Sequence, residues 1–328
     1  MKTQDAIDLL RAKIRLKHFA YSTEQAYCGW VARYCEFVRT VESGLTSEQK
    51  VEAFLTSMAK RDCSAVTQNQ AFHALLFFYA VALERPLQKV DALRAKRPAR
   101  TRECPSRAEV AALLGELRDT AACPSRLIAG LLYGAGLRVT EALELRVKDV
   151  RLADSELIVR DPKHGHDRLV PVPCCLVAPL QRQLAVARTV WERDQASCPR
   201  LPIALPERLA VKYPRAQWAL PWAWLFPAAG GCRHPRTGQL VRWRLHEAAI
   251  QRQFRDASDR LAQAGRPLSV PITPHVLRHG FGTHFVGDIR DLQAILGHKS
   301  LKTTATYRHP ELHRAPSPLD SLPVPSAA

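Results

Sequence analysis

The feature that most constrains the fold is a break in the sequence pattern after Pro86. The residues before it follow helical periodicities, whereas residues 94–102 carry five basic side chains and no acidic one. Because the helical pattern stops at this run, we interpret it as a linker between two domains. The predicted organisation is a first domain over residues 1–92, a linker over 93–103 and a second domain over 104–315.

The overall charge indicates a polyanionic partner. With 48 Lys and Arg against 31 Asp and Glu, the 328 residues carry a formal charge of +17, and the isoelectric point is about 9.8. A basic linker is well placed to follow a phosphate backbone, although many charged runs are only solvated. We predict DNA contacts from five linker residues: Arg94, Lys96, Arg97, Arg100 and Arg102.

The residues before the linker predict a bundle of roughly four helices. Segments 22–25 and 46–49 match the S/T-x-x-Q capping box, in which the first side chain caps a helix N-terminus. A further helix is expected over about 64–83. The longest apolar run, residues 74–83, is too short to cross a bilayer, and the chain does not open like a signal peptide. We therefore expect a soluble cytoplasmic protein.

The second domain is expected to combine helices with one β-hairpin. Residues 156–160 and 168–172 are short β-like runs that flank the turn-rich segment 161–167. Helical patterns cover about 176–194, 244–264, 274–286 and 292–296. Residues 199–240, rich in proline and tryptophan, indicate an inserted module. The tail over 316–328 is expected to be disordered.

Neither cysteine nor histidine gives a strong cofactor pattern. The nine cysteines form no CxxC pair, and this odd count fits a reducing compartment better than a disulfide framework. His275, His279 and His284 lie on one predicted helix, while His164 and His166 share the hairpin. No HExxH motif or cysteine quartet accompanies them. We predict no metal and no other cofactor.

Six residues that could handle a phosphate occur in order along the second domain, at loops and helix ends. They are Arg138, Lys163, His275, Arg278, His298 and Tyr307. Arg138 lies in a Gly-Leu-Arg-x-x-Glu motif, His275 and Arg278 form His-x-x-Arg, and Tyr307 follows His298 by nine residues. This order resembles the tyrosine recombinase signature. The resemblance implies a DNA strand-transferase with type IB topoisomerase-like chemistry, which works through a 3′-phosphotyrosyl intermediate without a cofactor.

The resemblance also implies a role for each side chain. The two arginines are expected to clamp the non-bridging phosphate oxygens, because each offers a rigid fork of donors to developing negative charge. Tyr307 is the expected nucleophile, His275 its base, and Lys163 the acid that protonates the departing 5′ oxygen. His298 is expected to donate a hydrogen bond to the phosphate and to order the site.

Within this superfamily the chain is similar to the integron integrases. The match includes residues 21–27, the helix around 67–70, the basic linker and the insert motifs 212–214 and 221–227. It implies two DNA partners, cassette sites folded from one strand and a double-stranded integron site. Protruding bases of a folded strand suit flat aromatic faces, although at least one insert tryptophan is expected to pack inside. We predict DNA contacts from Trp222, Trp224, Arg242, Trp243 and Arg244.

The family resemblance further implies an architecture and an assembly. We expect a mainly α protein, in which an all-α SAM-like core-binding domain and an α+β catalytic domain form a C-shaped clamp on DNA. Strand exchange joins two sites, so the expected working unit is a homotetramer on DNA. No membrane partner is expected, and the protein would be associated with the bacterial nucleoid when bound.

Two departures from the family pattern leave alternatives open. The hairpin has Pro162-Lys-His-Gly-His-Asp-Arg168 where the family usually has Gly-Lys-Gly-Gly-Lys-Asp-Arg, and the interval from Arg278 to His298 is shorter by about three residues, nearly one helical turn. A shortening within a helix would displace the tyrosine and impair catalysis. The second hypothesis is therefore a relative that holds recombination sites without cutting them. A metal-dependent nuclease that uses the histidines is the third.

Overall fold

The chain folds into two compact units, each with its own hydrophobic core. A computed structural model describes residues 2–42, 44–91, 103–120, 122–160, 167–298, 300 and 304. The units are Met1–Thr101 and Arg102–Ala328. Several predicted features lie outside the described residues: the linker apart from Glu103, the hairpin turn over 161–166, and the tail over 316–328.

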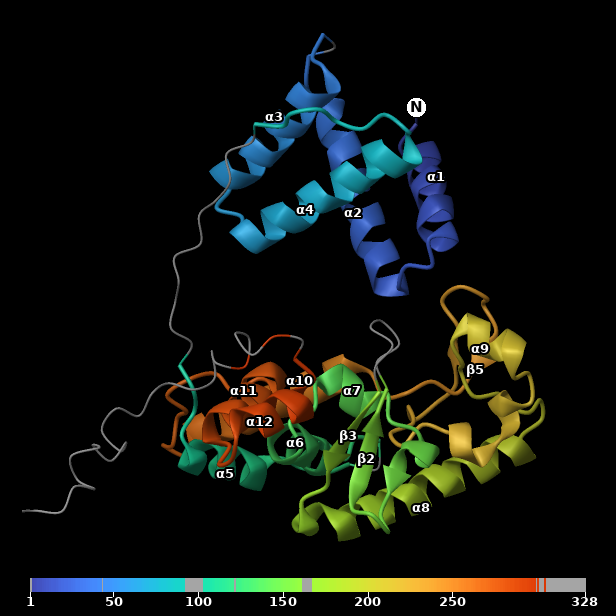
Figure 1. The fold of residues 1–328 in the computed structure, drawn as a ribbon, viewed down its shortest axis with the longest axis vertical. Coiled ribbons are helices and arrows are strands. Elements are labelled where there is room, and N and C mark those ends of the chain that lie inside the picture. The colour runs from blue at the N-terminus through green and yellow to red at the C-terminus, as the bar shows by residue number, and fades with distance from the viewer. Residues whose placement is uncertain are drawn as a thin grey trace, which may run out of the picture. The chain divides into compact units, whose positions relative to one another are not determined.

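The first unit is all helical (Figure 1). Its elements are α1 (Thr3–Leu16), α2 (Tyr21–Val38), α3 (Ser47–Lys60), α4 (Ala65–Phe77) and the π-helical turn η1 (Phe78–Ala82). Each helix turns an apolar stripe inward, so that Leu10, Val31, Leu55 and Leu75 are almost completely buried. The predicted bundle of about four helices is confirmed.

The two predicted capping boxes of this unit differ in outcome. At α3 the box is present: the Gln49 amide donates to Thr46 Oγ1 at 3.2 Å, and the Thr46 amide donates to Gln49 Oε1 at 2.9 Å. The prediction for residues 22–25 was wrong, because α2 begins at Tyr21 without a side-chain cap. Glu24 is instead fully buried and accepts from Arg15 Nη2 at 2.9 Å. Ser22 lies inside the first turn of α2 and not at its N-cap, which is Ala20.

The second unit surrounds a small antiparallel sheet with helices (Figure 1). Before the insert its elements are α5 (Arg107–Glu116), α6 (Ser125–Gly134), α7 (Val139–Leu143), η2 (Val147–Asp149), β1 (Val150–Arg151), β2 (Glu156–Val159), β3 (Arg168–Pro171) and α8 (Cys174–Ala196). The insert and the remainder form α9 (Glu207–Lys212), η3 (Ala216–Trp218), η4 (Leu220–Trp222), β4 (Cys232–Arg233), β5 (Leu240–Val241), α10 (Glu247–Gln263), α11 (Pro274–His284) and α12 (Ile289–Leu296).

The predicted hairpin forms the sheet, with one strand that the sequence did not reveal. β2 and β3 pair antiparallel with Leu157 opposite Val170, and the short β1 adds to the other edge of β2. Leu157, Val159 and Val170 are buried, so one face of the hairpin joins the core of the unit.

The two helices that flank the shortened interval keep regular ends. α11 ends at His284, two residues before the predicted end, and α12 begins at Ile289, three residues before the predicted start. The Asp288 side chain caps α12 by accepting from the Arg290 amide at 2.6 Å. Between the two helices the chain runs through a loop over residues 285–288.

Candidate active site

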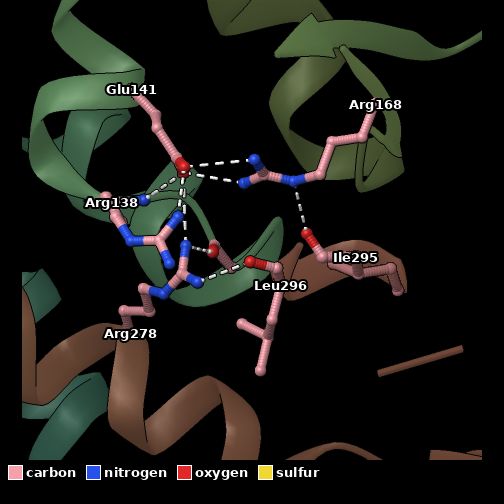
Figure 2. Close-up of polar contacts among 7 residues, drawn as sticks. Arg138, Glu141, Arg168, Arg278, Ile295 and Leu296 are labelled. Carbon is pink, nitrogen blue, oxygen red and sulfur yellow. Dashed lines mark hydrogen bonds and ion pairs between the residues drawn. The ribbon is translucent and has the colours of Figure 1, made fainter. Parts of the chain in front are cut away.

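A single carboxylate, that of Glu141, lies at the centre of the candidate site (Figure 2). Arg138 precedes α7 and Glu141 lies in its first turn, where the Glu141 carboxylate can accept from the backbone at the helix start, which is one half of a capping box. The Arg138 amide donates to Glu141 Oε2 at 2.8 Å, and Arg138 Nη1 donates to Glu141 Oε1 at 2.6 Å. The Arg138 side chain is 46% exposed, so its guanidinium faces solvent.

Two further arginines reach the same carboxylate from other elements (Figure 2). Arg168 of β3 forms a fork on it, with Nη1 to Oε1 at 3.1 Å and Nη2 to Oε2 at 2.7 Å. Arg278 of α11 is buried; its Nη1 donates to Gly136 O at 2.6 Å and to Glu141 Oε2 at 3.2 Å, and its Nη2 donates to Leu296 O at 2.8 Å. The α7, β3, α11 and α12 segments therefore meet at one cluster.

The cluster carries an excess of positive charge. Burial alone raises the pKa of Glu141, but the hydrogen bond and charge of Arg168, the Arg138 backbone and the charge of Arg278 together lower this pKa to about 2. Glu141 is thus ionised at neutral pH and opposes three guanidinium groups with one negative charge. The remaining positive charge suits an anion such as a phosphodiester.

His298 is held beside this cluster by the end of α12. Gly297 takes a left-handed conformation with φ of 64°, and the His298 amide then donates back to Gln293 O at 3.1 Å. The ring atom Nδ1 lies 3.1 Å from the hydroxyl oxygen of the buried Thr304. Burial, followed by the charges of Arg278, Arg138 and Arg168, lowers the pKa of His298 to about 4. Its imidazole is therefore neutral at pH 7.

The six predicted catalytic residues can now be located. Arg138 and Arg278 meet on Glu141, and Arg278 also holds the carbonyl of Leu296, two residues before His298. His275 is exposed one turn before Arg278 on α11, where it lines a cavity of about 600 Å³. Two of the predicted residues lie outside the described residues, and their roles stay predictions: Lys163 and Tyr307.

Two of the residues predicted to contact DNA, one in the insert and one just after it, are buried in this structure. Trp224 is only 8% exposed; its Nε1 donates to Arg242 O at 3.2 Å, and the Arg146 guanidinium lies 3.7 Å above its ring. Arg242 is 5% exposed and forms two 2.6 Å contacts with Asp194. Both side chains therefore face the interior of the unit in this structure, and their predicted DNA contacts stay predictions.

The remaining predicted contacts differ in accessibility. Trp222 is half-buried with Lys148 Nζ 2.9 Å from its ring centroid, and Trp243 is half-buried beside the His234 ring at 5.2 Å. Arg244 keeps a partly exposed side chain near Glu144. These three stay predictions. The five linker contacts lie outside the described residues: Arg94, Lys96, Arg97, Arg100 and Arg102.

Two histidines of α11, His279 and His284, make contacts with neighbouring side chains. His279 is 6% exposed, and its Nδ1 lies 3.5 Å from Thr283 Oγ1, whereas His284 Nδ1 lies 2.8 Å from the Tyr133 hydroxyl. In the described part of the chain, no three His, Cys, Asp or Glu side chains gather as metal ligands would. Within that same part, no helix is both long and apolar enough to span a bilayer.

Sequence reasoning missed two residues of the cluster, Glu141 and Arg168. A signal existed for the first, because Arg138-x-x-Glu141 has capping-box spacing at a helix start. Arg168 gives no such local signal, since its partners Glu141 and Ile295 lie 27 and 127 residues away in the chain. Only the packing of β3 against α12 brings them together.

Comparisons with known proteins identify relatives along nearly the whole chain. Residues 106–314 match the phage integrase family, and residues 7–89 match the N-terminal SAM-like domain of phage integrases. An integrase/recombinase of Escherichia coli and one of Pseudomonas aeruginosa are each 38% identical over 331 aligned residues, covering 98% of this chain and 95% of the relative. The Tn1549 transposon integrase in complex with transposon right end DNA shares the fold, with a TM-score of 0.61 and 17% identity, covering 94% of this chain and 96% of that one.

Proposed function

Because the chain belongs to the phage integrase family of tyrosine site-specific recombinases, we propose that it is a recombinase of the integron integrase type that cuts and rejoins gene-cassette sites through Tyr307. The observation that carries the catalytic part is the convergence of Arg138, Arg278 and His298 around Glu141. Three guanidinium groups against one carboxylate, those of Arg138, Arg168 and Arg278, leave charge to bind a phosphodiester in a partly desolvated site.

The proposed reaction conserves the energy of the phosphodiester. The Tyr307 oxygen attacks phosphorus and forms a 3′-phosphotyrosyl bond, while the bond to the 5′ oxygen breaks. His275 takes the phenolic proton, and Lys163 gives a proton to the departing oxygen. Arg138, Arg278 and His298 stabilise the charge on the non-bridging oxygens. A 5′-hydroxyl of the other site then attacks phosphorus, the proton transfers reverse, and the tyrosine is released.

The observation that supports the integron type is that the insert folds around a small hydrophobic core. Residues 199–240 include a small core of their own, with Ile203, Ala223 and Trp224 in it, and the Leu225 amide ties the insert to Leu145 O at 2.9 Å. Trp222 and Trp243 keep part of their aromatic surface at its edge. We propose that they stack on bases that protrude from a folded single-strand cassette site.

The assembly follows from strand exchange. We propose that the two units close on DNA as a clamp and that four subunits act together on two sites, one of them the double-stranded integron site. Sedimentation of protein with two site-length DNAs should give a species of four subunits. A complex that stops at one subunit for each site, without pairing of sites, would contradict this assembly.

The decisive experiment traps the covalent intermediate. Purified protein is incubated with a labelled folded cassette site that carries a nick beside the cleavage position. The short fragment with the freed 5′-hydroxyl then diffuses away and cannot reverse the reaction. We expect a protein–DNA band on denaturing gels that is absent for Tyr307→Phe. Tyr21→Phe, the same chemical change at an exposed tyrosine of the first unit, is the matched control and should keep the band.

Three other results would change the assignment. Binding without any covalent band would favour the alternative of a relative that holds recombination sites without cutting them. A band that forms on a double-stranded site but not on a folded single-strand site would keep the recombinase chemistry and reject the integron type. Cleavage that stops when a chelator is added would point to the metal-dependent nuclease.

A further inference from the structure

We propose that Arg168 is a positioning residue for the recombination reaction, which fixes the turn carrying His298 against the arginine cluster. The inference rests on the proposed function in one respect, since it takes His298 to act on the phosphate. Arg168 itself need not touch DNA. It acts through the carbonyl of Ile295 and the carboxylate of Glu141.

The contacts of Arg168 join three elements with one side chain (Figure 2). Nε donates to Ile295 O of α12 at 2.8 Å, while Nη1 and Nη2 hold the two oxygens of Glu141 at the start of α7. The side chain belongs to β3 and is only 13% exposed. A planar fork with fixed donor directions can satisfy all three acceptors at once, whereas a lysine presents a single ammonium group.

Strand geometry aims Arg168 at the cluster and its neighbour away from it. Asp167 accepts from Arg160 Nη1 at 2.6 Å, and Arg160 Nε also donates to the buried Asp149 at 3.0 Å. Successive residues of an extended strand point to opposite faces, so the pair formed by Asp167 and Arg160 lies on the other side of the hairpin. This pair offers a control that disturbs the same hairpin without touching α12.

The end of α12 depends on outside donors. The last carbonyls of a helix lack partners within it, and here Ile295 O accepts from Arg168 and Leu296 O accepts from Arg278. The absence of a side chain at Gly297 leaves room for Arg168. A Cβ at this glycine would lie 3.1 Å from Arg168 Cδ and 3.2 Å from its Nη1. His298 follows directly, so the turn that presents its ring is held between two guanidinium groups.

A double-mutant cycle tests whether Arg168 acts through His298. We expect Arg168→Gln to slow formation of the covalent complex about 100-fold, the usual cost of misplacing a reacting group by about 1 Å. When Arg168→Gln is combined with His298→Gln, the rate should fall by less than about threefold beyond the rate of His298→Gln alone. The turn then no longer carries the group that Arg168 positions. Arg168→Lys should not restore the rate, since the charge returns without the fork.

Arg160, on the same hairpin, provides the control variant for this cycle. Arg160→Gln should cost less than about fivefold alone, and this small loss should multiply with that of His298→Gln. The proposal would be overturned if the rate loss in the double variant equalled the product of the two single losses, of Arg168→Gln and His298→Gln. Arg168 would then act independently of the turn. Recovery in Arg168→Lys would also overturn it, because charge alone would suffice.

Hydrogen exchange in the free protein gives a second test that needs no DNA site. The amides of Gly297 and His298 donate to Ala294 O and Gln293 O, each at 3.1 Å. Loss of the Arg168 contact should raise their exchange rates about tenfold in Arg168→Gln and leave them unchanged in Arg160→Gln. Unchanged exchange in Arg168→Gln would overturn the inference. If exchange responds but the wild-type chain forms no covalent complex, the proposed function fails while the positioning of the turn stands.

Discussion

Two carboxylates of the second unit are both nearly buried and both paired with arginine, yet their charge environments are opposite. The Glu141 side chain is 12% exposed and meets three guanidinium groups, from Arg138, Arg168 and Arg278. The Asp194 side chain is 6% exposed and forms a balanced pair with Arg242 at 2.6 Å. The first arrangement retains positive charge, and the second is neutral. A buried arginine therefore marks an anion site only where positive charge is in excess.

The two clusters also differ in how accessible their arginines are to solvent. Around Glu141, the Arg138 side chain is 46% exposed and can meet a phosphate without unpacking. Around Asp194, the guanidinium of Arg242 is enclosed and also donates to Ala228 O at 2.7 Å. Removing a side chain should therefore reduce chemistry in the first cluster and stability in the second.

The largest effect is expected from Arg138→Ala. Loss of one preorganised donor to developing charge should slow covalent complex formation about 100- to 1,000-fold. The midpoint of urea unfolding should hardly change, because the side chain is half-exposed and its ion pair with Glu141 is partly solvated. Single-turnover cleavage on a nicked site measures the first quantity. A loss below about fivefold would remove Arg138 from the proposed clamp.

Asp194→Ala should have the reverse profile. It leaves the buried guanidinium of Arg242 without its carboxylate, and breaking a buried pair in this way costs about 3–5 kcal/mol of unfolding free energy. The folded fraction should cleave at a rate within a fewfold of the wild type. Chemical denaturation together with single-turnover cleavage checks both halves. If the rate fell while stability held, Asp194 would belong with the catalytic cluster.

A pH titration sharpens the comparison further. His298 has its pKa lowered from 6.5 to about 4, so the unfolded chain binds its proton at a higher pH than the folded one. The resulting stability is complete above about pH 6.5 and is lost as the pH falls through 4. Glu141, with a pKa lowered from 4.5 to about 2, contributes stability that is complete above about pH 4.5 and is lost as the pH falls through 2.

Urea midpoints measured across this range separate the two groups. His298→Gln should flatten the rise in stability between pH 4 and 6.5 and leave the more acidic part of the curve in place. Glu141→Gln is expected to act below about pH 4.5, besides lowering stability at neutral pH because three arginines lose their shared partner. An unchanged slope in His298→Gln would mean that the cluster does not depress this histidine.

How far the sequence predicts these clusters depends on the range of the contacts. Arg138-x-x-Glu141 and Thr46-x-x-Gln49 are visible in the sequence because their partners lie within one turn of a helix. The hairpin strands and the order of the catalytic motifs are local patterns as well. In contrast, Arg242 was predicted to contact DNA because nothing nearby reveals Asp194, which lies 48 residues away and buries it. Pairing over such distances is decided by tertiary packing.

The Arg244 side chain is intermediate in exposure between Arg138 and Arg242. Its substitution is expected to have the smallest effect of those considered. Its Nη2 lies 3.5 Å from Glu144 and 3.7 Å from Glu247, so each pair is loose and Arg244→Gln should change the unfolding free energy by less than about 0.5 kcal/mol. If it contacts a phosphate as predicted, the slope of log affinity against log salt should fall by about 0.9. Arg188→Gln, at an exposed arginine of α8 for which no DNA contact is predicted, is the matched control. A slope equal to that of the wild type would contradict the predicted DNA contact of Arg244.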